Sequence, residues 1–115
     1  MKYFNEQVIE EISFGDKKFQ ADLISTFVKQ VDKESKIIRK AMNDQDYDII
    51  AFKLHKIKSS LGFIGARGLS QNCEDLEKQY KFKDKKGQDF AIGINKLISE
   101  LNEAKQEIAH YVNNN

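Results

Sequence analysis

The chain has 115 residues, of which 40% are hydrophobic and 32% charged, a balance typical of a single globular domain spanning residues 1–115. Its 19 Lys and Arg nearly equal its 18 Asp and Glu, so charge gives no reason to expect nucleic acid or an anionic membrane as a partner. A single cysteine excludes an intrachain disulfide, and the chain has neither the apolar run of a signal peptide nor an 18-residue apolar stretch, so we expect a cytoplasmic protein.

The N-terminal part predicts a short helix followed by a long one. The short amphipathic segment has its apolar positions at Phe4, Val8, Ile9 and Ile12. Gly15 ends this segment, and Asp16 is a suitable N-cap for the helix that follows. The long helix is predicted from apolar residues at helical spacing, namely Phe19, Leu23, Phe27, Val31, Ile38 and Met42. The polar cluster 43–46 then breaks the chain.

A central helix is predicted from about Asp46 to Ile64, with Gly65 as its C-terminal stop. Its core stripe consists of Ile50, Leu54, Ile57, Leu61 and Ile64.

Two further helices follow. The first is marked by Leu69, Cys73, Leu76 and Tyr80, and a lysine-rich polar turn occupies 81–88. The last helix has its apolar positions at Phe90, Ile94, Leu97, Leu101, Ala104, Ile108 and Tyr111, and the tail 113–115 is expected to fray. No stretch alternates with period two, so the sequence predicts an all-α, up-and-down antiparallel four-helix bundle with a short extra N-terminal helix.

One histidine lies on the polar side of the central helix. At 100° per residue His55 lies away from the core stripe, in line with Ala51, Ser59 and Gly62, with Lys58 one turn further on. On composition alone, a surface histidine beside a lysine is unremarkable. A neutral imidazole is nevertheless a good nucleophile near pH 7, and its small neighbours would let another macromolecule approach it.

The residues around His55 also form a recognisable pattern. His-x-Ile-Lys-x-Ser begins at His55, Leu-Gly-x-Ile-Gly-Ala covers 61–66, and Leu69, Cys73 and Leu76-Glu77 follow. With these motifs, the segment 46–77 closely resembles the histidine-containing phosphotransfer (HPt) domain of multistep two-component phosphorelays, and the flanking helix pattern fits that family's size. One position departs: the family usually has glycine four residues after the histidine, where this chain has Ser59.

The resemblance implies a phosphohistidine intermediate in signal transduction. His55 would accept a phosphoryl group on Nε2 from the aspartyl phosphate of one receiver domain and pass it to the aspartate of another. Lys58 would stabilise the charge on the phosphoryl oxygens. Ser59, Gly62 and Ala51 would leave clearance for the docking receiver. The Ser59 hydroxyl could bond either to the phosphoryl group or to a carbonyl in the preceding turn.

Other polar residues carry weaker signals. Cys73 falls on an apolar stripe and is expected to be a small core residue. We favour a structural or lysine-pairing role for Glu77 and a structural role for His110, near the end of the last helix. Two distant histidines and one cysteine do not form a metal site, and no Gly-rich phosphate loop is present, so we expect no cofactor, no ATP site and no enzyme in the ordinary sense.

The expected partners are therefore receiver domains of response regulators and hybrid sensor histidine kinases, which would supply the aspartate and the Mg²⁺. The chain itself is expected to be a monomer. Two alternatives stay open: a module that binds receivers without phosphotransfer, and a helical bundle that acts as a scaffold or dimerisation domain.

Overall fold

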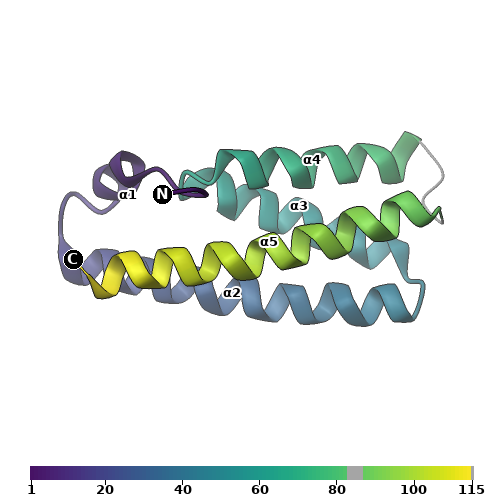
Figure 1. Cartoon of the computed structure of the whole chain (residues 1–115), viewed down its shortest axis with the longest axis horizontal. Helices are drawn as coiled ribbons and strands as arrows, with labels where there is room; N and C mark the ends of the chain where they lie inside the picture. Colours follow the sequence, from purple (N-terminus) through teal and green to yellow (C-terminus); the bar gives the residue numbers. More distant parts are fainter. Residues whose placement is uncertain (83–86, 115) are drawn as a thin grey trace.

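The computed structural model describes residues 1–82 and 87–114, and within these ranges the chain forms helices and no strand. In chain order they are α1 (Glu6–Ile12), α2 (Lys17–Asn43), α3 (Tyr47–Phe63), α4 (Arg67–Phe82) and α5 (Gln88–Asn113). The four long helices run antiparallel in an elongated bundle, and α1 lies across the end where both termini are found (Figure 1). The predicted all-α bundle with a short N-terminal helix is confirmed.

The helix ends are set by the residues that the sequence indicates. The Asp16 carboxylate accepts a hydrogen bond from the Phe19 amide at the start of α2, and Asp46 does the same for Ile49 at the start of α3. Gly65 follows α3 with φ +88°, in the left-handed region that favours glycine. A Cβ at Gly65 would lie only 2.9 Å from Cβ of Val8, so glycine also lets α1 pack closely against the end of α3.

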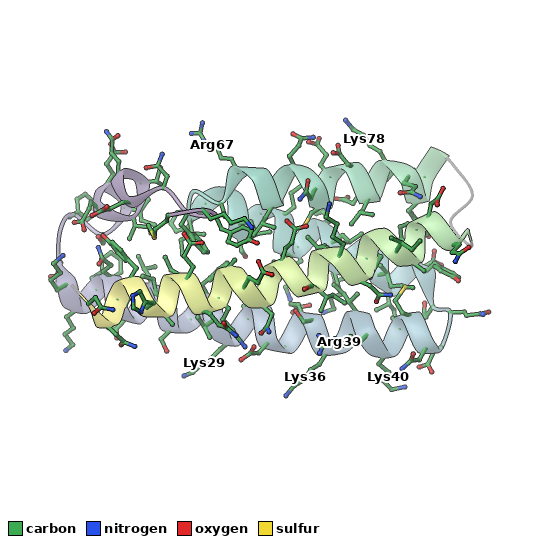
Figure 2. All side chains as sticks on the ribbon, viewed as in Figure 1. Lys29, Lys36, Arg39, Lys40, Arg67 and Lys78 are labelled. Carbon is green, nitrogen blue, oxygen red and sulfur yellow. The ribbon has the colours of Figure 1, made fainter. Side chains whose placement is uncertain are left out.

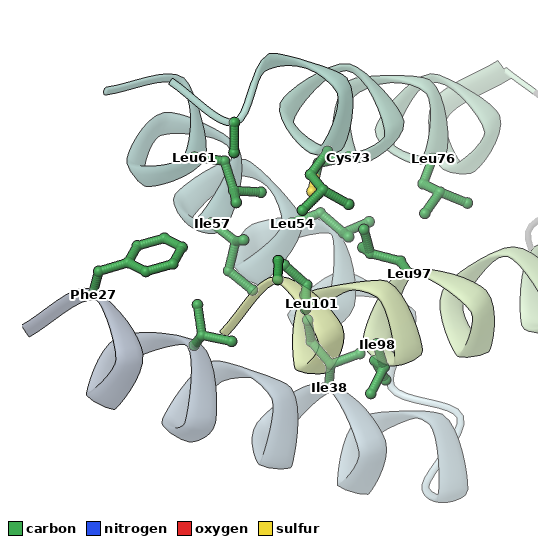
Figure 3. Packing of buried hydrophobic residues seen from close by; sticks show 14 of the residues in the cluster. Phe27, Ile38, Leu54, Ile57, Leu61, Cys73, Leu76, Leu97, Ile98 and Leu101 are labelled. Atoms are coloured by element: carbon green, nitrogen blue, oxygen red, sulfur yellow. The ribbon is translucent and has the colours of Figure 1, made fainter. Parts of the chain in front are cut away.

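The core is built from all four long helices (Figure 3). Ile50, Leu54, Ile57 and Leu61 of α3 are fully buried, and they meet Cys73 and Leu76 of α4 and an apolar face of α5. Burying a leucine or isoleucine stabilises a fold by about 1.5–3 kcal/mol. This stripe therefore fixes which side of α3 faces the bundle and which side faces solvent.

The core face of α2 differs from the prediction. Phe19 was expected on it but is 43% exposed, because the buried stripe passes through Gln20 instead. The amide of Gln20 donates to the hydroxyl of Ser13 beneath α1, which satisfies this polar side chain inside the fold. A second buried polar residue on α2, Glu34, lies 3.0 Å from the ammonium of Lys53 on α3.

Half of the predicted lysine-rich turn at 81–88, residues 83–86, lies outside the described residues. Of the other half, Lys81 and Phe82 still belong to α4, Gly87 is the N-cap of α5 and Gln88 is its first residue, so the turn is shorter than predicted. Of the tail, Asn113 lies in the last turn of α5, Asn114 is its C-cap, and Asn115 is outside the described residues. No helix in the described part of the chain is long and apolar enough to span a membrane.

Candidate functional site

His55 projects from the side of α3 that faces away from the core. Its side chain is 66% exposed, whereas its neighbours Leu54 and Ile57 are fully buried. The helical pattern of α3 therefore forces the imidazole outward, and the side chain is accessible to another macromolecule.

A carboxylate from the next helix holds one nitrogen of that imidazole. Oε2 of Glu77, on α4, lies 3.3 Å from Nδ1 of His55, and the Glu77 side chain is only 10% exposed. An ionised carboxylate can only accept hydrogen bonds, so Nδ1 is the donor in this contact. This assigns the proton to Nδ1 and leaves the Nε2 lone pair available. Nε2 has no hydrogen-bond partner among the residues that the structure describes.

The same carboxylate also binds a cation. Nζ of Lys58 lies 3.1 Å from Oε1 of Glu77, in an ion pair whose geometry falls outside that of a hydrogen bond. Glu77 thus bridges His55 and Lys58, which are neighbours on the surface of α3. The lysine-pairing role favoured for Glu77 is present. Its contact with His55 was not favoured from the sequence, because a carboxylate would repel a phosphoryl group on the histidine.

Helix α4 fixes this arrangement by its packing on α3. Ser70 donates its hydroxyl to the Lys58 carbonyl oxygen at 3.0 Å, and Tyr80 bonds to Asp48 near the other end of the interface. Between them, Cys73 is fully buried, as expected. Burial raises the pKa of the Cys73 thiol to about 12, and the neighbouring charge of Glu77 acts in the same direction. The register between α3 and α4 is therefore what brings Glu77 beneath His55.

The small residues beside His55 lie where the sequence places them. Ser59 and Gly62 are exposed, and Ala51 is half-buried. The Ser59 hydroxyl donates to the His55 carbonyl oxygen at 3.4 Å, which is the second of the two alternatives for this side chain. A Cβ at Gly62 would meet only Oγ of Ser70, at an ordinary contact distance of 3.6 Å. Packing between helices therefore does not require glycine at position 62.

Apolar surface extends from the imidazole toward α2. Phe52, one turn before His55, is 66% exposed, and Phe63, two turns after it, is 61% exposed. A groove of about 330 Å³ lies between α2 and α3 and is lined by Ile12, Leu23, Thr26, Phe27, Gln30, Ser59, Ser60, Phe63 and Ile64. This surface was not predicted from the sequence. The signal for it was the presence of two phenylalanines off the core stripe of α3.

His110, the other histidine, lies in the last turn of α5, and its carbonyl and ring contact the Asn114 side chain. No carboxylate forms an ion pair with it among the described residues. Within the same part of the chain, no group of three or more His, Cys, Asp or Glu residues could hold a metal ion.

Comparisons with known proteins bear on this geometry. The family model described as "Hpt domain" matches residues 22–108. The crystal structure of histidine-containing phosphotransfer protein B (HptB) from Pseudomonas aeruginosa PAO1 has a TM-score of 0.85 to this chain, covering 98% of this chain and 96% of that one. The two sequences are 16% identical, so this likeness shows a shared fold. No curated protein matches the sequence.

Proposed function

Since this chain belongs to the Hpt domain family and has a histidine phosphotransfer role in phosphorelay signalling, we propose that His55 carries the phosphoryl group. The observation that carries the proposal is the imidazole itself, which is exposed and has Nδ1 held by Glu77 with Nε2 unpartnered among the described residues. The Nε2 lone pair attacks the phosphorus of an aspartyl phosphate, the bond from phosphorus to the aspartate oxygen breaks, and a free carboxylate leaves. Transfer onward is the reverse step with a second aspartate.

Glu77 and Lys58 stabilise the charges that develop in this reaction. Bond formation at Nε2 draws electron density from the ring, and the carboxylate of Glu77 stabilises the resulting charge while it holds Nδ1–H. Lys58 compensates the charge of Glu77 in the resting state. When His55 carries a phosphoryl group, the ammonium of Lys58, one helical turn from His55, stabilises the phosphoryl oxygens.

Hpt domains work with receiver domains in phosphorelays, and Hpt proteins are phosphotransfer carriers rather than classical enzymes. We place the receiver on the face formed by α2 and α3, where the apolar groove and Phe63 adjoin Ser59 and His55. The receiver, from a response regulator or a hybrid sensor kinase, supplies the aspartate and its Mg²⁺. This chain binds neither ATP nor a cofactor, and it acts as a monomer in the cytoplasm.

Incubation with a panel of receivers carrying ³²P-labelled aspartyl phosphate tests the proposal. Label should appear on this chain as acid-labile, base-stable phosphate and should disappear when an unphosphorylated receiver is added. Receiver binding without any transfer of label would support the receiver-binding alternative instead. A stable dimer that buries His55 would support the scaffold alternative.

A further inference from the structure

A polar cleft lies on the side of the bundle away from His55. Helix α5 packs against α2 and α4, as α3 does, so α3 and α5 occupy diagonal positions in the bundle. The cleft has a volume of about 200 Å³ and runs along the border between α2 and α5. A ligand in it would not cover the imidazole on α3.

The cleft has an apolar floor and polar walls. Val31 and Ile98, both buried, form the floor. The antiparallel packing of α2 and α5 sets Ser35 opposite Asn102 along the walls, and an ion pair of 2.7 Å between Lys105 and Asp32 closes one end. A hydroxyl and a side-chain amide therefore border the middle of the cleft.

The other end of the cleft is cationic and without counter-charge. Arg39 and Lys36 line it, and neither forms an ion pair with any residue that the structure describes. Both lie on α2 in Figure 2, where the Lys36 side chain extends outward from the bundle. With Lys105 matched by Asp32, two positive charges face the cleft unmatched.

We propose that this cleft binds a small oxyanion of the phosphate class. The guanidinium of Arg39 offers a planar pair of donors that matches two oxygens of a tetrahedral anion. Lys36, the Ser35 hydroxyl and the Asn102 amide supply further donors. Pockets for drug-sized ligands have volumes of about 300–1,000 Å³. The smaller volume here fits inorganic phosphate, pyrophosphate or a compact phosphomonoester rather than a nucleotide.

Titration of the ¹⁵N-labelled chain with phosphate and with pyrophosphate, at constant ionic strength, tests the proposal. Saturable amide shifts should centre on Ser35, Arg39 and Asn102, with sodium chloride as the reference salt. Saturation by phosphate would assign the site to a single phosphate group, and saturation by pyrophosphate alone would assign it to a diphosphate. Shifts that do not saturate, or that centre on His55 and Lys58, would overturn it.

Substitutions that change the charge of cleft residues test whether the anion binds in the cleft. Arg39→Gln and Lys36→Gln should each weaken binding by about threefold or more. Asp32→Asn should strengthen binding by a similar factor, because it removes a negative charge and frees Lys105.

Lys33→Gln is the matched control, since Lys33 is an exposed lysine of α2 outside the cleft, and this substitution should change the affinity little. Equal weakening by Lys33→Gln and Arg39→Gln would reduce the effect to general charge attraction, and weaker binding in Asp32→Asn would overturn the proposed site. Circular dichroism and transfer to His55 should stay unchanged in all four variants.

Discussion

Oε2 of Glu77 lies 3.3 Å from Nδ1 of His55, although the two residues are 22 positions apart in the chain and belong to different helices. A carboxylate close to a phosphoryl-accepting histidine would by itself repel the incoming phosphate. Lys58 offsets this repulsion, because its ammonium pairs with the other oxygen of the same carboxylate. The functional unit we propose is therefore His55, Glu77 and Lys58 together.

Glu77→Gln and Glu77→Ala separate the hydrogen bond of Glu77 from its charge. The amide oxygen of glutamine can still accept from Nδ1–H, so we expect transfer within about threefold of the wild type. Alanine leaves the imidazole free to rotate, and transfer should slow by about tenfold or more. Transfer rates from one phosphorylated receiver measure this, and ¹⁵N NMR of the ring should show Nδ1 protonated in the wild type and the glutamine variant. Normal transfer in the alanine variant would remove Glu77 from the mechanism.

Lys58→Ala should slow transfer and also lower the free energy of unfolding by about 1–3 kcal/mol, because the largely buried Glu77 loses its counter-ion. The two effects can be separated with the double variant Lys58→Ala/Glu77→Gln. Removing both charges should restore stability without restoring the transfer rate. If the double variant also recovers full transfer, Lys58 acts only by compensating Glu77 and not on the phosphoryl group.

Ser59 is the position at which this chain departs from the family pattern. Its hydroxyl bonds to the carbonyl oxygen of its own helix, so Ser59→Ala should leave the transfer rate unchanged. Ser59→Gly should also preserve transfer, at a cost of up to about 1 kcal/mol in helix stability. Ser59→Leu should block transfer while the fold survives, because the added bulk keeps the receiver's aspartate from His55. Efficient transfer by the leucine variant would contradict the clearance role.

The buried thiol of Cys73 predicts a pH dependence of stability. Its pKa is raised to about 12 in the folded chain, whereas the thiol of an unfolded chain has a pKa of about 8.5. Between these values the unfolded chain has lost a proton that the folded chain keeps, so the free energy of unfolding falls as pH rises through this window. Urea titrations of the wild type and Cys73→Ala should therefore differ by a constant amount from pH 6 to 8 and by less at pH 10. A difference that stays constant to pH 10 would show that the thiol ionises equally in both states.

The helices and the orientation of His55 could be predicted from the sequence because both are local properties. Apolar spacing, the two aspartate caps and Gly65 fix the limits of α3 and the side of it that is buried. Once that side is fixed, the imidazole must point outward.

Features that depend on the register between helices could not be predicted in this way. The contact of Glu77 with His55 requires α4 to pack on α3 at one particular offset, which no local pattern specifies. The pairing of buried Glu34 with Lys53 has the same origin. The groove beside Ser59 depends in addition on where α1 lies over the end of the bundle. The error at Phe19 is of this kind, since the buried Gln20 side chain finds its hydrogen-bond partners, Ser13 and Glu10, in the N-terminal segment that packs on α2.

Comparison of the wild type with His55→Gln tests whether His55 receives the phosphoryl group. A receiver carrying labelled aspartyl phosphate is mixed with each, and label on this chain is followed over time. The wild type should become labelled and the variant should not, while the free energy of unfolding changes by about 0.5 kcal/mol or less because the side chain is exposed. Labelling of the variant at the wild-type rate would show that another residue receives the phosphoryl group and make His110 the next candidate.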